Sequence, residues 1–166
     1  MRQNTENQLL KIFYEYPGKA FTVRELTRLT RIPRATVHKY LIKLKKQNLI
    51  SRDNKAEKNL LFKTKKINYF TELIVSSGLV DELIDLFNPS CIILFGSVRK
   101  GDSISESDID LFIESSVEKE ISLESYQKKL GHKIQLFVEK DINKLQPHLL
   151  NNVVNGIKLY GSFKIK

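Results

Sequence analysis

Hydrophobic residues in the first 48 positions recur at the three- and four-residue spacing of an amphipathic helix, in three separate stretches. The spacing predicts helices over residues 7–16, 23–30 and 33–48. Thr22 is a suitable N-cap for the second helix, and Pro33 suits the first turn of the third. The expected buried faces are Leu9, Leu10, Phe13 and Tyr16, then Val23, Leu26 and Leu29, and finally Val37, Tyr40, Leu41 and Leu44.

Between residues 48 and 66 the helical spacing gives way to short apolar runs around a polar turn. The segments "NLISRD" (48–53) and "LLFKTKK" (60–66) predict two strands, which the turn "NKAEKN" would join into a β-hairpin. Two amphipathic stretches follow and are broken near residues 76–78. They predict a linker helix and a second helix before residue 91.

From residue 91 onward the pattern predicts strands as well as helices. "CIILF" (91–95) is the continuous apolar run of a strand that is covered on both faces. "DIDLFIE" (108–114) alternates, which places its apolar side chains on one face and Asp108 and Asp110 on the other. A helix, a strand and a closing helix are expected over residues 118–131, 132–139 and 145–160. The predicted fold is therefore α/β, of the α+β type, with a small mixed sheet in its second half.

The charge of the chain is divided unevenly between its two parts. The net charge is +9, but residues 1–70 carry 17 Lys and Arg against 5 Asp and Glu, whereas residues 71–166 carry 11 against 14. This asymmetry predicts two units with different partners, and it predicts an anionic partner for the basic first unit. The expected domains are residues 1–66 and 78–166, joined by a linker helix over residues 67–77.

Composition narrows the class of protein further. No apolar run approaches the roughly 18 residues of a membrane span, and the N-terminal residues lack the apolar core of a signal peptide. The single cysteine, Cys91, falls in a predicted strand and cannot form an internal disulfide. The three histidines are not at metal-ligand spacing. These observations predict a cytoplasmic protein without a membrane partner.

The string "FTVRELTRLTRIPRATVHKYLIKLKKQNLI" (21–50), with the hairpin expected after it, resembles the winged helix-turn-helix family of DNA-binding domains. The resemblance covers residues 5–66 and implies a recognition helix over residues 33–47, a wing over residues 52–63 and a role in transcription regulation. DNA or RNA would be the partner, with basic side chains neutralising phosphates. The candidate nucleic-acid-binding residues are Arg24, Arg28, Arg31, Arg34, Thr36, His38, Lys39, Lys43, Lys55 and Lys58.

Within this set, Arg34, Thr36 and His38 are candidates for contacts with base edges, and the other residues for contacts with phosphates. The alternative is a solvated basic surface on a helical domain that binds only another protein. A linker helix such as residues 67–75 often pairs with its copy in winged-helix proteins, so the resemblance also implies a homodimer.

The segment "LFGSVRKGDSISESDIDLFIE" (94–114) places Gly-Ser after one strand and Asp-x-Asp on the next. This order and separation resemble the signature of the minimal nucleotidyltransferases, in the polymerase-beta-like superfamily, over roughly residues 78–161. The resemblance implies a site for a nucleoside triphosphate. Asp108 and Asp110 share one face of a strand and can bind Mg²⁺ together with the phosphates.

The glycine turn would hold the phosphates of that nucleotide. At Gly96 the backbone can approach a phosphate closely, and the helix that follows offers free N–H groups to the anion. The Ser97 hydroxyl can add a hydrogen bond, and Arg99 and Lys100 can approach the triphosphate.

Active members of this superfamily carry a third carboxylate on the strand next to Asp-x-Asp, and here "KIQLFV" places Gln135 at that position. A neutral amide is a poor Mg²⁺ ligand and no general base, so Mg²⁺ binding would be weak and turnover impaired. The favoured hypothesis is a nucleic-acid-binding protein whose transferase-like domain binds nucleotide without efficient transfer. The alternative is an active enzyme that moves NMP from NTP to a hydroxyl of a protein or nucleic acid.

Overall fold

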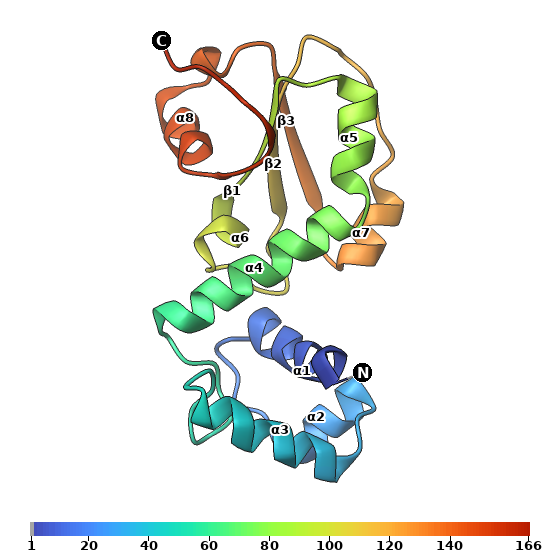
Figure 1. The fold of residues 1–166 in the computed structure, drawn as a ribbon, viewed down its shortest axis with the longest axis vertical. Helices are drawn as coiled ribbons and strands as arrows, with labels where there is room; N and C mark the ends of the chain where they lie inside the picture. Colours follow the sequence, from blue (N-terminus) through green and yellow to red (C-terminus); the bar gives the residue numbers. More distant parts are fainter. Residues whose placement is uncertain (1) are drawn as a thin grey trace. The chain divides into compact units, whose positions relative to one another are not determined.

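The chain divides into two compact units between Lys66 and Ile67, and the computed structural model describes residues 2–166, with side chains from residue 5 onward. Three helices build the first unit, and their order along the chain is visible in Figure 1. They are α1 (Arg2–Glu15), α2 (Val23–Thr30) and α3 (Arg34–Lys46).

The three predicted helices are confirmed, with ends that differ by a few residues for α1 and α3. Thr22 caps α2 as predicted, because its hydroxyl accepts from the Glu25 N–H at 3.1 Å while the Glu25 carboxylate accepts from the Thr22 N–H at 2.8 Å. Two predicted core residues are exposed instead, Tyr16 by 48% and Leu29 by 53%. The buried residues of the three helices are Leu9, Leu10, Phe13, Tyr14, Leu26, Val37, Leu41 and Leu44.

The predicted hairpin is wrong, because residues 48–53 contribute only an isolated bridge at Ile50 and residues 60–66 form the first turns of α4 (Leu60–Ser76). The Asn59 side chain accepts from the Phe62 N–H at 2.8 Å and so starts a helix. Buried positions then recur every fourth residue, at Phe62, Lys66, Phe70 and Ile74, which is the period of a helix and not of a strand.

What remains of the expected wing is a tight turn. Ile50 and Ala56 form an isolated antiparallel bridge, and within it the Ser51 N–H donates to the Lys55 carbonyl at 2.8 Å. Since the chain enters α4 at Leu60, the wing cannot extend over residues 52–63 as predicted.

The second unit contains a four-stranded mixed sheet in the order β3-β2-β1-β4. Strand β1 is antiparallel to both β2 and β4, and β2 is parallel to β3. The α+β class is thereby confirmed. The strands are β1 (Cys91–Phe95), β2 (Ile109–Glu114), β3 (Ile134–Glu139) and β4 (Ile157–Gly161). The helices are α5 (Leu79–Phe87), α6 (Gly96–Lys100), α7 (Glu124–Leu130) and α8 (Pro147–Val154), with a 3₁₀ turn, η1 (Ile142–Lys144).

Two helix predictions in this unit were too long. The helix expected over 118–131 is restricted to α7, and the closing helix over 145–160 ends at Val154, after which the chain forms β4. Gly156 lies at this transition. A Cβ there would come within 2.3 Å of Ile93 Cγ2, so the chain passes against β1 where a side chain would collide.

Both faces of β1 are covered, since all five of its residues are buried. On one face Cys91, Ile93 and Phe95 pack with Phe112 and with residues from η1 and α8. Figure 1 shows α8 and α5 on opposite sides of the sheet. None of the helices within residues 2–166 is long and apolar enough to cross a membrane.

Candidate functional site

The two predicted aspartates lie at the start of β2, between the end of β1 and the start of β3. In the sheet register Asp110 stands opposite Phe95 of β1 on one side and Gln135 of β3 on the other. Asp108 precedes it by two residues and therefore faces the same side of the sheet. Sequence reasoning expected this pairing of Gln135 with the Asp-x-Asp strand.

Gly96, the first residue of α6, packs directly against Asp110. A Cβ at Gly96 would lie 1.9 Å from Asp110 Oδ2, and the glycine also has φ of +72°, a conformation that residues with side chains rarely adopt. The glycine is thus required for the approach of a carboxylate from the same chain, in addition to any role toward a phosphate. This contact depends on the antiparallel register of two strands, which the sequence does not specify.

Asp110 is held in a partly buried position where its charge is unfavourable. Burial raises the pKa of the Asp110 carboxyl, and the neighbouring Asp108 carboxylate raises that pKa further. A cation that contacted both aspartates would relieve this repulsion. Two carboxylates with the oxygen atoms of a nucleotide are the ligands that Mg²⁺ prefers in proteins.

Gln135 contacts the site through Asp108. Its amide Nε2 donates a hydrogen bond to Asp108 Oδ2 at 2.5 Å. Sequence reasoning gave Gln135 only the role of a missing ligand and did not find this bond, because strand register fixes which residues pair but not which side-chain rotamers meet.

The other acids on β2 and β3 lie away from the two aspartates. Glu114 and Glu139 pair with each other in the register, about 13 Å along the strands from Asp110 and Gln135. Within the part of the chain that the structure describes, no three His, Cys, Asp or Glu side chains gather where they could hold a metal ion.

The remaining predicted phosphate contacts lie on α6, next to Gly96. Ser97 and Arg99 are half-buried and Lys100 is exposed. The Asp102 N–H donates to the Ser97 carbonyl at 3.0 Å, which closes this short helix after one turn. These three residues follow Gly96 in the chain, and Gly96 is adjacent to Asp110.

The basic residues of the first unit are mostly exposed. Arg24, Arg28, Arg31, Arg34, His38, Lys39, Lys43 and Lys58 are exposed, and Thr36 and Lys55 are half-buried. Their charges are not equally available, because Lys43 forms an ion pair with Glu6 and lies 6.0 Å from the centre of the Tyr40 ring. A cavity of about 560 Å³ opens where α2 and α3 begin, lined by Val23, Arg34, Ala35 and His38.

Comparison with known proteins agrees with this geometry. A family model described as "Nucleotidyltransferase domain" matches residues 76–165, which is more than half of the chain and includes both aspartates, Gly96 and Gln135. No curated protein and no solved structure matches the chain. The chain therefore belongs to the nucleotidyltransferase domain family.

Proposed function

We propose that the second unit binds a nucleoside triphosphate with one Mg²⁺ ion and transfers its nucleotidyl group slowly or not at all. The observation that carries this proposal is the bond from Gln135 to Asp108, at the position next to Asp110 where a third carboxylate is expected. An amide that donates to Asp108 supplies no negative charge and no base for the attacking hydroxyl.

The donor set fits one Mg²⁺ ion and not two. Asp108 and Asp110 would hold an ion that is also bound by phosphates, and that ion would neutralise charge on the triphosphate. Gly96 leaves room for the Asp110 carboxylate, and Ser97 follows Gly96 in α6. Activation of a hydroxyl would need a further anionic ligand or base, and no acid other than the two aspartates lies beside them within the described region.

Binding and transfer can be tested with the same variants. The protein is incubated with each labelled NTP and Mn²⁺ or Mg²⁺, in the presence of DNA, RNA and protein acceptors, and both bound and incorporated label are measured. We expect saturable, metal-dependent binding that Asp110→Asn abolishes and that Asp85→Asn, a change on the exposed surface of α5, leaves intact. Efficient incorporation that Asp110→Asn abolishes would establish the active enzyme instead.

The first unit favours a second function, nucleic-acid binding. Its support is the exposed basic surface on α2 and α3 and the adjoining cavity lined by Arg34 and His38. Three helices with a basic third helix can place that helix in a major groove, and its cations would displace counterions from the phosphates. Because the turn after α3 is shorter than the predicted wing, α3 would make the main contact with the nucleic acid.

Salt dependence distinguishes this function from binding of a protein. Duplex and single-stranded DNA and RNA are titrated at increasing salt concentration. Lys39→Ala should reduce the slope of log K against log salt by about one counterion, and Lys43→Ala by less, since Lys43 is already paired with Glu6. Lys128→Ala, on the exposed surface of α7, serves as the control. If neither α3 variant changes the slope, α3 is not part of the nucleic-acid interface.

A further inference from the structure

His132 is a buried histidine that sequence analysis left without a role. Only 4% of its surface is exposed, and its ring meets the Phe70 ring edge to face with the centroids 5.3 Å apart. Its Nδ1 atom lies 2.7 Å from the carbonyl oxygen of Ser107. Because a carbonyl oxygen can only accept, Nδ1 carries the proton and donates it to this bond.

This bond is made to the residue directly before Asp108. Ser107 ends a tight turn in which its N–H donates to the Ile104 carbonyl at 2.9 Å and its hydroxyl accepts from the Ile104 N–H at 2.8 Å. His132 thus fixes the peptide that joins this turn to the first carboxylate. Without that donor, the Ser107 carbonyl oxygen would lose a hydrogen bond in a partly buried position, which costs free energy.

The residue after His132 holds the other side of Asp108. The carbonyl of Lys133 accepts from the Ile109 N–H at 2.8 Å. Two consecutive residues directly before β3 therefore hold the residues before and after Asp108, while Gln135 contacts its side chain. The backbone at Asp108 is restrained on both sides, and only one of these two restraints comes from a side chain.

We propose that His132 is a positioning residue, which sets the orientation of Asp108 toward the metal–nucleotide site through the Ser107 carbonyl. The inference rests on the proposed function, since it assigns Asp108 as a ligand. Residues that orient a metal ligand through a hydrogen bond typically change metal affinity by 10- to 100-fold when they are replaced. The competing explanation is a histidine that only fills space beside Phe70.

Two substitutions of similar polarity separate these explanations. His132→Asn places an amide donor near the position of Nδ1, whereas His132→Gln places it near Nε2 and leaves the Ser107 carbonyl without its donor. His148→Asn, on the exposed surface of α8, is the control. Each full-length variant is examined for its unfolding midpoint, for the NMR signals of the Asp108 amide and side-chain carboxyl in metal-free buffer, and for affinity toward Mn²⁺ with ATP.

We expect His132→Gln to shift or broaden the Asp108 signals and to weaken Mn²⁺–ATP binding by about tenfold, while His132→Asn stays within about threefold of the unsubstituted protein. Equal affinities and unchanged Asp108 signals in both variants, even with lowered unfolding midpoints, would overturn the inference. If the unsubstituted protein does not bind Mn²⁺–ATP, the proposed function fails. The Asp108 signals of the metal-free variants then still decide whether His132 positions that residue.

Discussion

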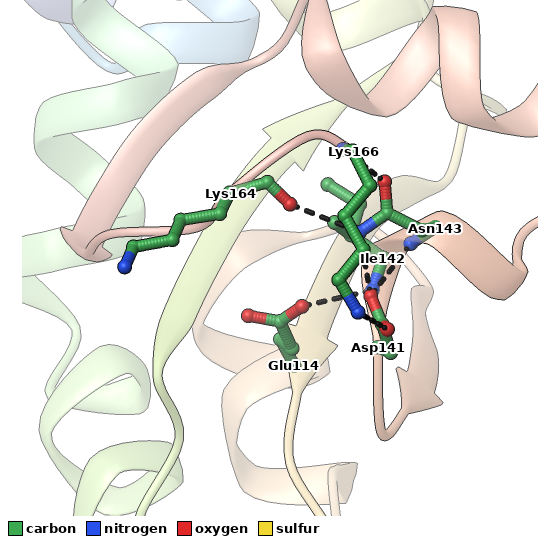
Figure 2. A network of polar contacts seen from close by, with 6 residues as sticks. All are labelled: Glu114, Asp141, Ile142, Asn143, Lys164 and Lys166. Carbon is green, nitrogen blue, oxygen red and sulfur yellow. Dashed lines mark hydrogen bonds and ion pairs between the residues drawn. The ribbon is translucent and has the colours of Figure 1, made fainter.

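Strand β2 has carboxylates near both ends, and the surroundings of these two carboxylates differ. At its start, burial and the neighbouring Asp108 raise the pKa of Asp110. At its end, Glu114 accepts a hydrogen bond from the Ile142 N–H at 2.8 Å and another from the Ser90 hydroxyl. Figure 2 shows this second region, where Glu114 reaches the start of η1.

The network in Figure 2 continues from η1 to the C-terminal residues. Asp141 accepts from the Asn143 side chain at 2.7 Å and the Asn143 N–H at 3.0 Å, and pairs with Lys166 at 3.2 Å. Asn143 in turn donates to the Lys164 carbonyl at 2.9 Å and accepts from the Lys166 N–H at 2.9 Å. These bonds lower the pKa of Asp141 to about 2, with the Asn143 side chain contributing most.

The difference indicates which acids are structural and which are functional. Carboxylates that receive several donors from their own chain stabilise the fold and have little capacity left for a ligand. Asp110 is instead desolvated beside a second negative charge, a state that lowers stability unless a cation is bound. The end of β2 with the poorly neutralised charge is therefore the candidate site, and Glu114 at the other end holds the start of η1.

The largest expected effect is that of Gly96→Ala, which changes the end of β2 that carries Asp110. The added Cβ would collide with Asp110 Oδ2, and the residue would keep a φ of +72°. Strain and overpacking together should lower the free energy of unfolding by about 3 kcal/mol and abolish Mn²⁺–nucleotide binding. Urea unfolding and a binding titration measure the two effects.

Gly78→Ala is the matched control for that variant. Gly78 has a φ of +87° but no atom within 4 Å of its added Cβ, so it carries only the conformational strain. Its cost should be about 1 kcal/mol, with nucleotide binding retained. Equal losses of stability in the two variants would show that the contact between Gly96 and Asp110 is unimportant.

Local patterns predicted elements correctly in both units and failed in both. The apolar run of β1 and the alternation at the start of β2 predicted those two strands correctly. "LLFKTKK" failed because a short apolar run fits either state. The helix is favoured by the Asn59 cap and by the burial of Phe62, Lys66, Phe70 and Ile74. Burial depends on tertiary packing, which a short segment of sequence does not specify.

The members of the candidate site were expected from the sequence, but their contacts were not. Gly96, Asp108, Asp110 and Gln135 were named from the resemblance to the minimal nucleotidyltransferases, and their roles stay predictions. The close approach of Gly96 to Asp110 and the bond from Gln135 to Asp108 arise from strand register and rotamers, which involve residues up to 27 positions apart. β4 was missed because "GIKLY" continued an apparent helical pattern, and only packing against β1 separates it from α8.

Glu114→Ala tests the other end of β2, with a somewhat smaller effect. The Ile142 N–H, on a fully buried residue, would lose its acceptor, and the Ser90 hydroxyl would keep only the main-chain carbonyl of residue 114, at 3.2 Å. We expect a loss of about 2 kcal/mol in the free energy of unfolding, with nucleotide binding unchanged. Glu118→Ala is the control, since the Glu118 side chain is 87% exposed and reaches Lys140 only at 3.9 Å. A change in nucleotide affinity in Glu114→Ala would contradict the separation of the two ends.

Gln135→Asp should make the Asp110 end more dependent on a cation. Without metal, a third carboxylate beside two others should lower the free energy of unfolding by about 1 kcal/mol. With Mn²⁺ the order should reverse, because tighter binding to the folded state stabilises it, and Mn²⁺ affinity should rise by about tenfold. Gln135→Asn, which shortens the side chain without adding charge, should show neither the loss caused by charge repulsion nor the gain with Mn²⁺. No gain in affinity in Gln135→Asp would refute the assignment of this position.

The smallest effect expected is a difference in pH dependence between Asp110, near the start of β2, and Asp141, which caps η1. The pKa of Asp141 falls from its ordinary 3.8 to about 2 on folding, so its contribution to stability is complete above 3.8 and is lost as the pH falls toward 2. The pKa of Asp110 is raised instead, so its ionisation lowers stability as the pH rises through and beyond 3.8. In metal-free buffer, Asp141→Asn should therefore weaken the loss of stability on acidification, whereas Asp110→Asn should strengthen it. Urea unfolding midpoints between pH 2 and 6 measure both slopes, and slopes that change in the same direction would show that the two carboxylates are in similar states after all.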